Sequence, residues 1–320
     1  MRARYLSLIA IWGGSFLFIK VGLEVLAPLQ VVLGRMALGA LALLATMVIR
    51  RVPLPREPRL WLHMAVAATL LNTVPYTLFA YAEQRIPSSV ASICNATTPL
   101  FTLLVAMVAL PDERPTVARG LGLVLGFLGV LVVFGVWSGG DARPDLVGVL
   151  LGLIASVLYG AGGVYLRRYL STTRYSGLAI SAGQMLIGAL QLAIVTPLVT
   201  TAPSHLPGHV VLAILALGAL GTGVAYVLQY TLIRTAGPTL TSTVTYCIPV
   251  VSIGLGVLVL GEHIAWNAPV GAAIIIVGAV LSRAVRRPAA AASPPLGSLG
   301  EPAAVAAVPV SRVAWVRGLA

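Results

Sequence analysis

Residues 28–49 read PLQVVLGRMALGALALLATMVI, an apolar run with one charged residue, Arg35. A helix rises 1.5 Å per residue, so this run is long enough to cross the roughly 30 Å hydrocarbon core of a bilayer. In lipid a helix satisfies its own backbone hydrogen bonds, which an isolated strand does not do. This stretch therefore predicts a membrane-spanning helix.

The rest of the chain has the same character. It has 320 residues, of which 58% are hydrophobic and 9% are charged, with a mean hydropathy of +0.98. Ordinary soluble domains carry about 25% charged residues, so this composition excludes a soluble enzyme. The net charge of +12 is scattered among apolar runs and forms no stripe that could follow a nucleic-acid backbone. Cys94 and Cys247 both lie inside apolar runs, so we expect neither a disulfide framework nor a metal site, and no cofactor.

Hydropathy divides the chain into ten expected spans, which makes the fold class all-α integral membrane. The expected spans are 5–23, 28–49, 60–81, 87–110, 117–136, 146–166, 176–198, 210–233, 238–260 and 268–285. The first span follows a short basic segment and contains no small-residue cleavage site, so we interpret it as retained.

The distribution of Lys and Arg between the loops predicts the orientation. Of the 21 basic residues, fifteen fall on one side of the expected membrane and three on the other, namely Lys20, Arg85 and Arg143. Basic loops stay in the cytoplasm, so both termini are expected there, in a multi-pass protein of the cell (inner or plasma) membrane. Residues 288–320 are rich in Pro and Ala, which predicts a disordered cytoplasmic tail. The tail is either an extension without function or a partner-binding segment around Trp315.

The two halves of the chain resemble each other. Tyr76 aligns with Tyr226 and Pro99 with Pro249 at a shift of 150, and Trp12 aligns with Tyr159 at 147. Five spans per copy would make the second copy enter the membrane from the opposite side. We therefore expect two inverted five-helix repeats, at 1–140 and 141–287. Inverted repeats permit alternating access to a central site, although a repeat can also record gene duplication alone.

These residues carry a resemblance to the drug/metabolite transporter superfamily, and within it to the EamA-type ten-helix exporters. The residues that carry it are Trp12-Gly13-Gly14-Ser15-Phe16, Arg35, Pro99, Asp112-Glu113-Arg114-Pro115-Thr116, Gly122, Gly129, Tyr159-Gly160, Pro249, Gly261-Glu262, Gly271 and Gly278. The resemblance implies a central cavity walled by helices 1 to 4 and 6 to 9, with helices 5 and 10 packed behind. It also implies the export of amino acids or related metabolites. The chain departs from the family pattern at Pro111-Asp112, in a loop.

Polar and aromatic residues at membrane depth are the candidates for a substrate site. Asn72 and Tyr76 are four residues apart, hence on one helix face, and Thr222 and Tyr226 repeat that arrangement. The full set of expected substrate-binding residues is Trp12, Arg35, Asn72, Tyr76, Asn95, Tyr159, Gln184, Tyr226, Gln229 and Tyr246. Helix packing is the alternative for the aromatic and hydroxyl residues.

Four positions bear on the transport cycle. Pro99 and Pro249 expose backbone carbonyls and are expected to break helices or act as gates. Arg35 either attracts an anionic substrate group, or pairs structurally with Glu83 or Glu24, or extends its side chain to the outer membrane interface. Proton-driven carriers keep an ionisable group inside the membrane, and Glu83 is the acid nearest to the Arg35 region. The protein is thus either a facilitator driven by the substrate gradient or a carrier that couples protons through Glu83.

The function expected from these features is secondary transport of a small amphipathic metabolite such as an amino acid. Two other classes of membrane protein are the alternatives. A lipid-acting membrane enzyme would need a nucleophile, an acid-base pair or a metal, and none is visible in the sequence. A non-transporting scaffold would not explain the repeat. The expected partners are the lipid bilayer and a small-molecule substrate, with no nucleic acid. The glycine pairs Gly122 with Gly126 and Gly148 with Gly152 permit close helix approach, either between two protomers or internally, so the protein is a monomer or a homodimer.

Overall fold

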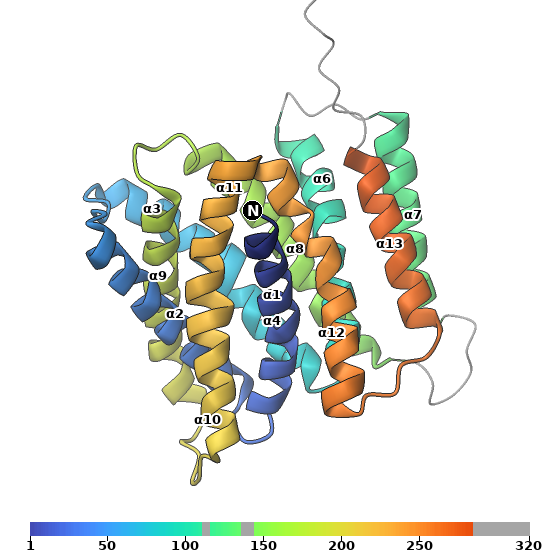
Figure 1. Ribbon diagram of the computed structural model, residues 1–320, viewed down its shortest axis with the longest axis horizontal. Helices are drawn as coiled ribbons and strands as arrows, with labels where there is room; N and C mark the ends of the chain where they lie inside the picture. The colour runs from blue at the N-terminus through green and yellow to red at the C-terminus, as the bar shows by residue number, and fades with distance from the viewer. Residues whose placement is uncertain (111–115, 136–143, 284–320) are drawn as a thin grey trace, which may run out of the picture. The chain divides into compact units, whose positions relative to one another are not determined.

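The computed structural model describes residues 1–110, 116–135 and 144–283. They form a compact unit bounded as Met1–Val285. The expected tail at 288–320 and the Glu113 motif lie outside the described residues. All regular structure in the described ranges is helical, as expected for this composition (Figure 1).

The helices follow the apolar runs closely. The first half contains α1 (Arg2–Gly22), α2 (Pro28–Arg50), α3 (Pro58–Ala68), the π-helical segment η1 (Thr69–Thr73), α4 (Val74–Glu83), α5 (Ser88–Ala96), α6 (Thr98–Ala109) and α7 (Val117–Phe134). The second half contains α8 (Leu146–Tyr169), α9 (Gly177–Val199), α10 (Gly208–Leu215), the π-helical segment η3 (Ala216–Val224), α11 (Ala225–Ser242), α12 (Val244–Leu260) and α13 (Asn267–Arg283).

Seven helical stretches in the described ranges are long and apolar enough to cross a membrane, and three shorter ones are also apolar. The seven are Arg2–Gly22, Pro28–Arg50, Pro58–Glu83, Ser88–Ala109, Leu146–Tyr169, Gly177–Val199 and Gly208–Ala236. The shorter three are Val117–Val133, Val244–Leu260 and Asn267–Leu281. Each of these stretches overlaps one expected span.

Most helix ends lie within three residues of the expected ones, but the boundary between α11 and α12 differs by more. The sequence predicts a loop between residues 233 and 238, because Gly237 and Pro238 usually end a helix. In the structure α11 continues through this segment to Ser242, and the interruption comes at Thr243. A proline removes one backbone hydrogen bond, and a helix that is held by its neighbours can continue past that loss.

Helix packing in the two halves is reciprocal. The first helix of each half packs on the fourth of the other: α1 on α12, and α8 on α5 and α6. The second helix of each half packs on the third of the other: α2 on η3, and α9 on α3 and η1. The equivalent pairs α2 with α9 and α7 with α13 are also in contact. Exchanging the two halves therefore leaves this contact pattern unchanged.

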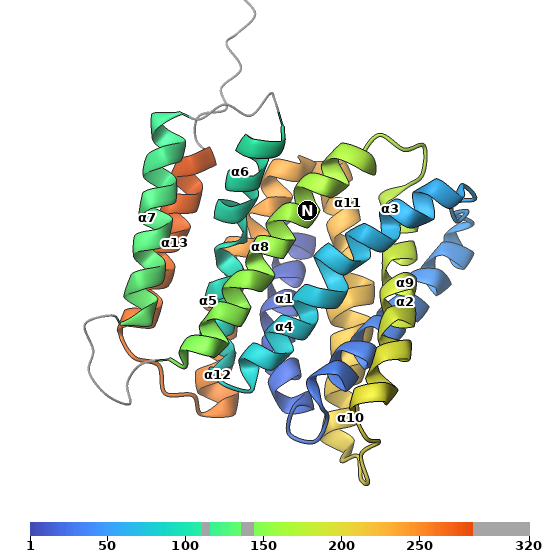
Figure 2. The ribbon, with the colours of Figure 1, turned by 180° about the vertical axis from the view of Figure 1, so that it is seen from behind.

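Helices α7 and α13 form a tight pair at one side of the bundle, as both views show (Figure 1 and Figure 2). A Cβ added to Gly278 would lie 2.6 Å from the backbone nitrogen of Gly126, and one added to Gly129 would lie 2.8 Å from the carbonyl oxygen of Gly271. Gly152 likewise approaches Cys94, where a Cβ would lie 2.9 Å from that of the cysteine. These glycines serve internal helix packing within one chain.

Candidate functional site

A cavity of about 620 Å³ lies between the helices of the two halves. Its lining residues come from α1, α2, α4 with η1, α5 and α6, α8, α9, α11 and α12. No residue of α7 or α13 is among them in the described ranges. The cavity is therefore walled by the helices that the resemblance implied, with the α7 and α13 pair outside.

Eight of the ten expected substrate-binding residues line this cavity: Trp12, Arg35, Tyr76, Asn95, Tyr159, Gln184, Tyr226 and Gln229. The other two do not. Asn72 is fully buried behind the wall, where it bonds to two lining residues. Tyr246 is also buried, at 6% exposure, and packs in the core beside the cavity.

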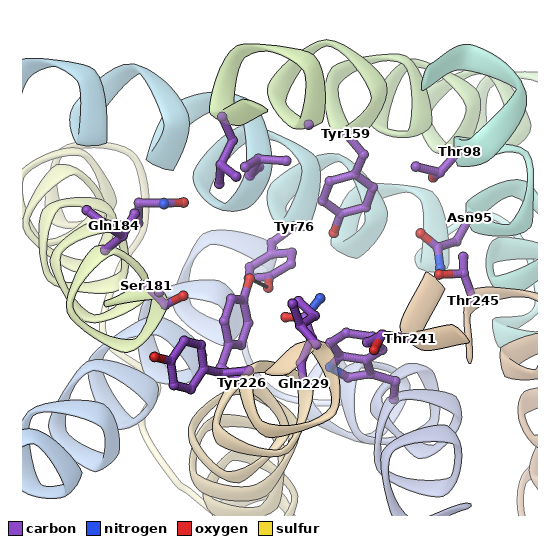
Figure 3. A pocket seen from close by; sticks show the side chains of 18 of the residues that line it. Tyr76, Asn95, Thr98, Tyr159, Ser181, Gln184, Tyr226, Gln229, Thr241 and Thr245 are labelled. Carbon is purple, nitrogen blue, oxygen red and sulfur yellow. Dashed lines mark hydrogen bonds between the residues drawn. The ribbon is translucent and has the colours of Figure 1, made fainter. Parts of the chain in front are cut away.

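Tyrosine hydroxyls and amides form a chain across the cavity wall. The Tyr76 hydroxyl oxygen lies 3.3 Å from that of Tyr226 (Figure 3). The Tyr226 hydroxyl donates to Asn72 Oδ1 at 2.9 Å. Asn72 Nδ2 donates to Gln184 Oε1 at 3.3 Å. Because Tyr226 donates to Asn72, it accepts the hydrogen bond from Tyr76. The chain joins helices of both halves and fixes the direction of each hydroxyl.

The two π-helical segments position the polar ends of this wall. Asn72 lies in η1, and its repeat counterpart Thr222 lies in η3. A π-helical turn widens the helix locally and shifts its side chains, which is why such turns are frequent at functional sites. The Thr222 hydroxyl accepts a hydrogen bond from Arg35 Nε at 3.1 Å. The sequence carries no clear signal for these segments.

Arg35 is 7% exposed, and its guanidinium carbon lies 3.8 Å from the centre of the Tyr76 ring. The structural pair considered from the sequence is not formed. Glu24 pairs instead with His209, at 2.9 Å between Oε2 and Nε2, on the surface. The Glu83 carboxylate oxygens have no hydrogen-bond partner in the described part of the chain. Arg35 thus lines the cavity without a carboxylate partner.

Aromatic rings form the apolar wall. The rings of Phe79 and Tyr159 stack with centroids 5.9 Å apart, and Tyr76 meets Tyr159 edge-on at 6.4 Å. Phe16 meets Phe79 edge-on at 5.8 Å. These rings give the cavity a rigid, mainly apolar surface against which a flat or branched ligand body could pack.

The two ends of the cavity differ in exposure. At one end the lining residues Phe16, Ile19 and Phe79 are buried. At the other end the lining includes Ser171 and Gly177, which are exposed, and Ile233, which is 40% exposed. The cavity therefore leads from a closed end to the molecular surface around the α8–α9 connection.

Polar contacts lie beyond the closed end. Lys20 Nζ donates to the backbone carbonyls of Glu83 and Ile86, at 2.5 and 3.2 Å. Glu262 accepts hydrogen bonds from the backbone N–H groups of Ser88 and Ser89, at 2.7 and 3.2 Å. A carboxylate at a helix N-terminus is a favourable charge placement, so Glu262 holds the start of α5.

The two candidate prolines lie beside the cavity. Pro99 and Pro249 are buried and do not line it. A proline has no N–H, so the carbonyl four residues earlier loses its helical partner. Those residues are Asn95 and Thr245, which are 150 positions apart and both line the cavity (Figure 3). The helix also breaks just before Pro99, between α5 and α6.

Several polar lining residues were not among the expected ones. They are Ser15, Thr98, Thr102, Ser171, Tyr175, Ser181, Tyr230, Thr241 and Thr245. Ser181 lies three residues before Gln184, and Tyr230 lies four residues after Tyr226, so both share a helix face with an expected residue. Applying the same helical spacing to one more turn of each helix would have predicted Ser181 and Tyr230. Ser171 and Tyr175 lie at the α8–α9 connection, where helical spacing carries no such signal.

The comparisons with known proteins agree with this architecture. The model of the EamA-like transporter family matches twice, at residues 5–135 and 146–284. A relative in Escherichia coli, named "Uncharacterized inner membrane transporter YedA", is 30% identical over 279 residues, covering 86% of this chain and 88% of the relative. One in Bacillus subtilis, named "Uncharacterized transporter YoaV", is 25% identical and covers 85% and 93%. A solved crystal structure superposes with a TM-score of 0.63 at 22% identity, over 88% of this chain and 95% of that one.

The double family match covers both halves of the chain, and the sequence repeat coincides with it. The apolar helices, the central cavity and the named transporters among the relatives point the same way. The chain is a membrane transporter and belongs to the EamA-like transporter family.

Proposed function

We propose that the protein is a secondary transporter that exports a small amphipathic metabolite, such as an amino acid, by alternating access. The observation that carries this proposal is the central cavity. Repeat-related residues from both halves line it, it is closed at one end, and it reaches exposed residues at the other. A site between two equivalent halves is the arrangement in which access can alternate.

Ten spans in two inverted repeats, 1–140 and 141–287 followed by a tail at 288–320, are part of the proposal. The seven long and three shorter apolar helices supply ten segments. The reciprocal packing of the halves supports a two-fold relation, and five spans per half would invert the second copy. We keep the prediction that both termini are cytoplasmic.

With that orientation the open end of the cavity faces the cytoplasm. Arg167, Arg168 and Arg174 flank the lining residues Ser171 and Tyr175 there, which agrees with the preference of basic residues for the cytoplasmic side. An exporter loads its substrate from this side. Opening the other end would require α1 to release the carbonyls that Lys20 holds.

Proton coupling through Glu83 is a second candidate because of one specific observation. Its side chain is fully buried, and neither carboxylate oxygen has a hydrogen-bond partner within the described ranges. An ionised carboxylate in that setting is costly, whereas the neutral acid is tolerated. A gain and loss of this proton during the cycle would couple transport to a pH gradient. A facilitator that uses only the substrate gradient is the other scheme.

The rival classes have less support. A lipid-acting enzyme would need an acid-base pair or a metal at the cavity, and its lining contains no Asp, Glu, His or Cys in the described part. A scaffold would have no use for a polar cavity between repeat-related helices. We propose no metal, cofactor or nucleic-acid partner, and a monomer or homodimer in the bilayer.

The test is uptake by the purified protein in proteoliposomes, with a pooled panel of labelled amino acids and small metabolites. Saturable uptake that falls in a Tyr76→Phe variant and is unchanged in Tyr81→Phe would support the proposal. Tyr81 is a matched control because it lies on the same helix, outside the cavity lining, and is 38% exposed. Equal loss of uptake in both variants would contradict a substrate site at Tyr76.

A further inference from the structure

Arg35 is the one charged side chain among the described residues that line the cavity. The other lining residues are aromatic, aliphatic, hydroxyl-bearing or amide-bearing. Arg35 is more than nine-tenths buried, and no carboxylate in the described ranges lies within ion-pair distance of it. A buried guanidinium without an ion-pair partner is unfavourable, so a ligand that supplies a carboxylate in direct contact would be bound strongly at this position.

The donors of Arg35 are mostly unused. A guanidinium carries five N–H groups, and the one on Nε is donated to Thr222. No hydrogen bond joins the two Nη groups to any described residue. Stacking over the Tyr76 ring orients the plane and leaves the guanidinium edge available. Two parallel N–H groups on that edge match the two oxygens of a carboxylate.

The cavity offers no matching partner for an ammonium group. No Asp or Glu lines it in the described part of the chain. Glu83 is buried outside the lining, and Glu24 is held by His209 at the surface. An amine inside the cavity would meet only rings, hydroxyls and amides, together with the positive charge of Arg35. One negative charge on the ligand would neutralise Arg35, whereas a positive charge on the ligand would have no partner in the cavity.

We propose that the ligand is a monoanionic organic carboxylate with a compact aromatic or branched apolar body, and that Arg35 binds its carboxylate. This inference rests on the proposed function and narrows its substrate class: the carboxylate is required, and an α-amino group adds nothing to binding. A doubly charged phosphate ester is disfavoured, because one guanidinium would leave a second negative charge uncompensated in a mainly apolar cavity. The body packs against the rings of Phe79 and Tyr159.

The experiment measures equilibrium binding to the full-length purified protein with ligands that share one body. One series is 3-phenylpropionate, phenylalanine, 3-phenylpropionamide and 2-phenylethylamine, and the other is 4-methylpentanoate with its amino acid, amide and amine counterparts. The expected order in at least one series is acid equal to or tighter than amino acid, with amide and amine weaker by about tenfold to a hundredfold. That range is typical for loss of a charge-assisted hydrogen-bonded pair.

Variants assign the effect to the residue. Arg35→Gln should weaken binding of the acid by a similar factor and leave binding of the amide unchanged. Arg35→Lys should bind the acid with intermediate affinity, because lysine keeps the charge but lacks the two parallel N–H groups of a guanidinium. Arg50→Gln is the matched control, since it removes an exposed arginine from the same helix and should change nothing. If Arg35→Gln does not fold, the ligand series on the unmodified protein still shows whether binding requires a carboxylate.

Amide or amine binding as tight as the acid would overturn the inference, and so would binding of no acid in either series. These outcomes are separable from failure of the proposed function. Binding of the acid without flux in proteoliposomes would refute transport and leave the carboxylate site intact. Flux of amines or neutral amides, with acids excluded, would keep a transporter and remove the Arg35 site.

Discussion

The phenol oxygens of Tyr76 and Tyr226 lie 3.3 Å apart, and the two residues are repeat counterparts separated by 150 positions. In the proposed two-fold arrangement, a residue and its counterpart meet only near the axis that would relate the two halves. The hydrogen-bonded pair joins the two halves on the wall of the cavity. Any motion that exchanges the conformations of the halves has to keep or break this contact.

Removing either hydroxyl should weaken substrate binding. Loss of one neutral hydrogen bond costs about 0.5–1.5 kcal/mol, which is up to about tenfold in affinity. Tyr226→Phe should cost more than Tyr76→Phe, because it also leaves Asn72 Oδ1 without its donor. A double-mutant cycle measured by ligand binding tests the coupling of the two hydroxyls. The double variant should lose less binding free energy than the sum of the losses in the two single variants. Strict additivity would mean that the two hydroxyls act independently.

The packing of α7 on α13 predicts a pair of opposite effects on stability. Gly129→Ala would place a Cβ 2.8 Å from the Gly271 carbonyl oxygen, so the helices must separate, at a typical overpacking cost of about 1–3 kcal/mol. Gly120→Ala, on the same helix, meets nothing within 4 Å and should be neutral or stabilising by about 0.5–1 kcal/mol. Thermal unfolding in detergent measures both. Equal effects of the two substitutions would contradict the close contact.

The features that could be predicted from the sequence are those that depend on local hydropathy and on the internal repeat. Apolar length predicted the helices, and the shift of 150 paired Tyr76 with Tyr226 and Pro99 with Pro249. The assignment of Asn72 to the cavity was different, because helical spacing identifies a face and does not say which residue of that face is covered. Asn72 bonds to Gln184 and Tyr226 from behind the wall.

Features that depend on the surroundings were beyond the sequence. The π-helical segments η1 and η3 and the continuation of α11 past Pro238 are fixed by neighbouring helices, not by the residues themselves. The same holds for the role of Arg35. The sequence left open a pair with Glu24 or Glu83, and in the folded structure neither carboxylate forms an ion pair with the guanidinium within the described ranges.

Glu262 should contribute measurably to stability through the start of α5. Its carboxylate accepts from two backbone N–H groups and from the Ser89 hydroxyl, at 2.6 Å for the last. Glu262→Ala would leave these donors without their acceptor, at about 1–3 kcal/mol. Glu24→Gln is the control, because an exposed ion pair such as Glu24 with His209 contributes about 0–1 kcal/mol. Thermal unfolding with a larger loss for Glu24→Gln would reverse this assignment.

A pH effect is expected where α3 meets the α8–α9 connection. The Tyr175 hydroxyl, followed by the backbone N–H of Glu57 and the Arg174 guanidinium, lowers the pKa of Glu57 from its ordinary value of 4.5. The folded-state pKa is thus below the unfolded one, so this contribution to stability is present above pH 4.5 and is lost as the pH falls through the folded-state pKa. Glu57→Gln should flatten the fall in melting temperature over that acidic range. Tyr175→Phe should move the fall toward pH 4.5, and identical profiles for all three proteins would contradict the assignment.

Glu83→Gln separates the two energy-coupling schemes. Glu83 is fully buried at the end of α4, and the charged groups that face it are Lys20 from α1, Arg35 from α2 and Glu262 from the segment after α12. Glutamine has the shape of the neutral acid, so the variant should fold and keep substrate exchange. If the proton on Glu83 is exchanged during the cycle, the variant should lose the response of uptake to an imposed pH gradient, because glutamine cannot bind or release that proton.

The measurement is uptake by wild type and variant in proteoliposomes, with and without the pH gradient, alongside Glu24→Gln. Glu24 is a suitable control because it is exposed and engaged with His209, so its loss should leave the gradient response as in the wild type. A gradient response that survives in Glu83→Gln would place the coupling proton elsewhere. A wild-type protein with saturable uptake and no gradient response would favour the facilitator, and Glu83 would then have no part in energy coupling.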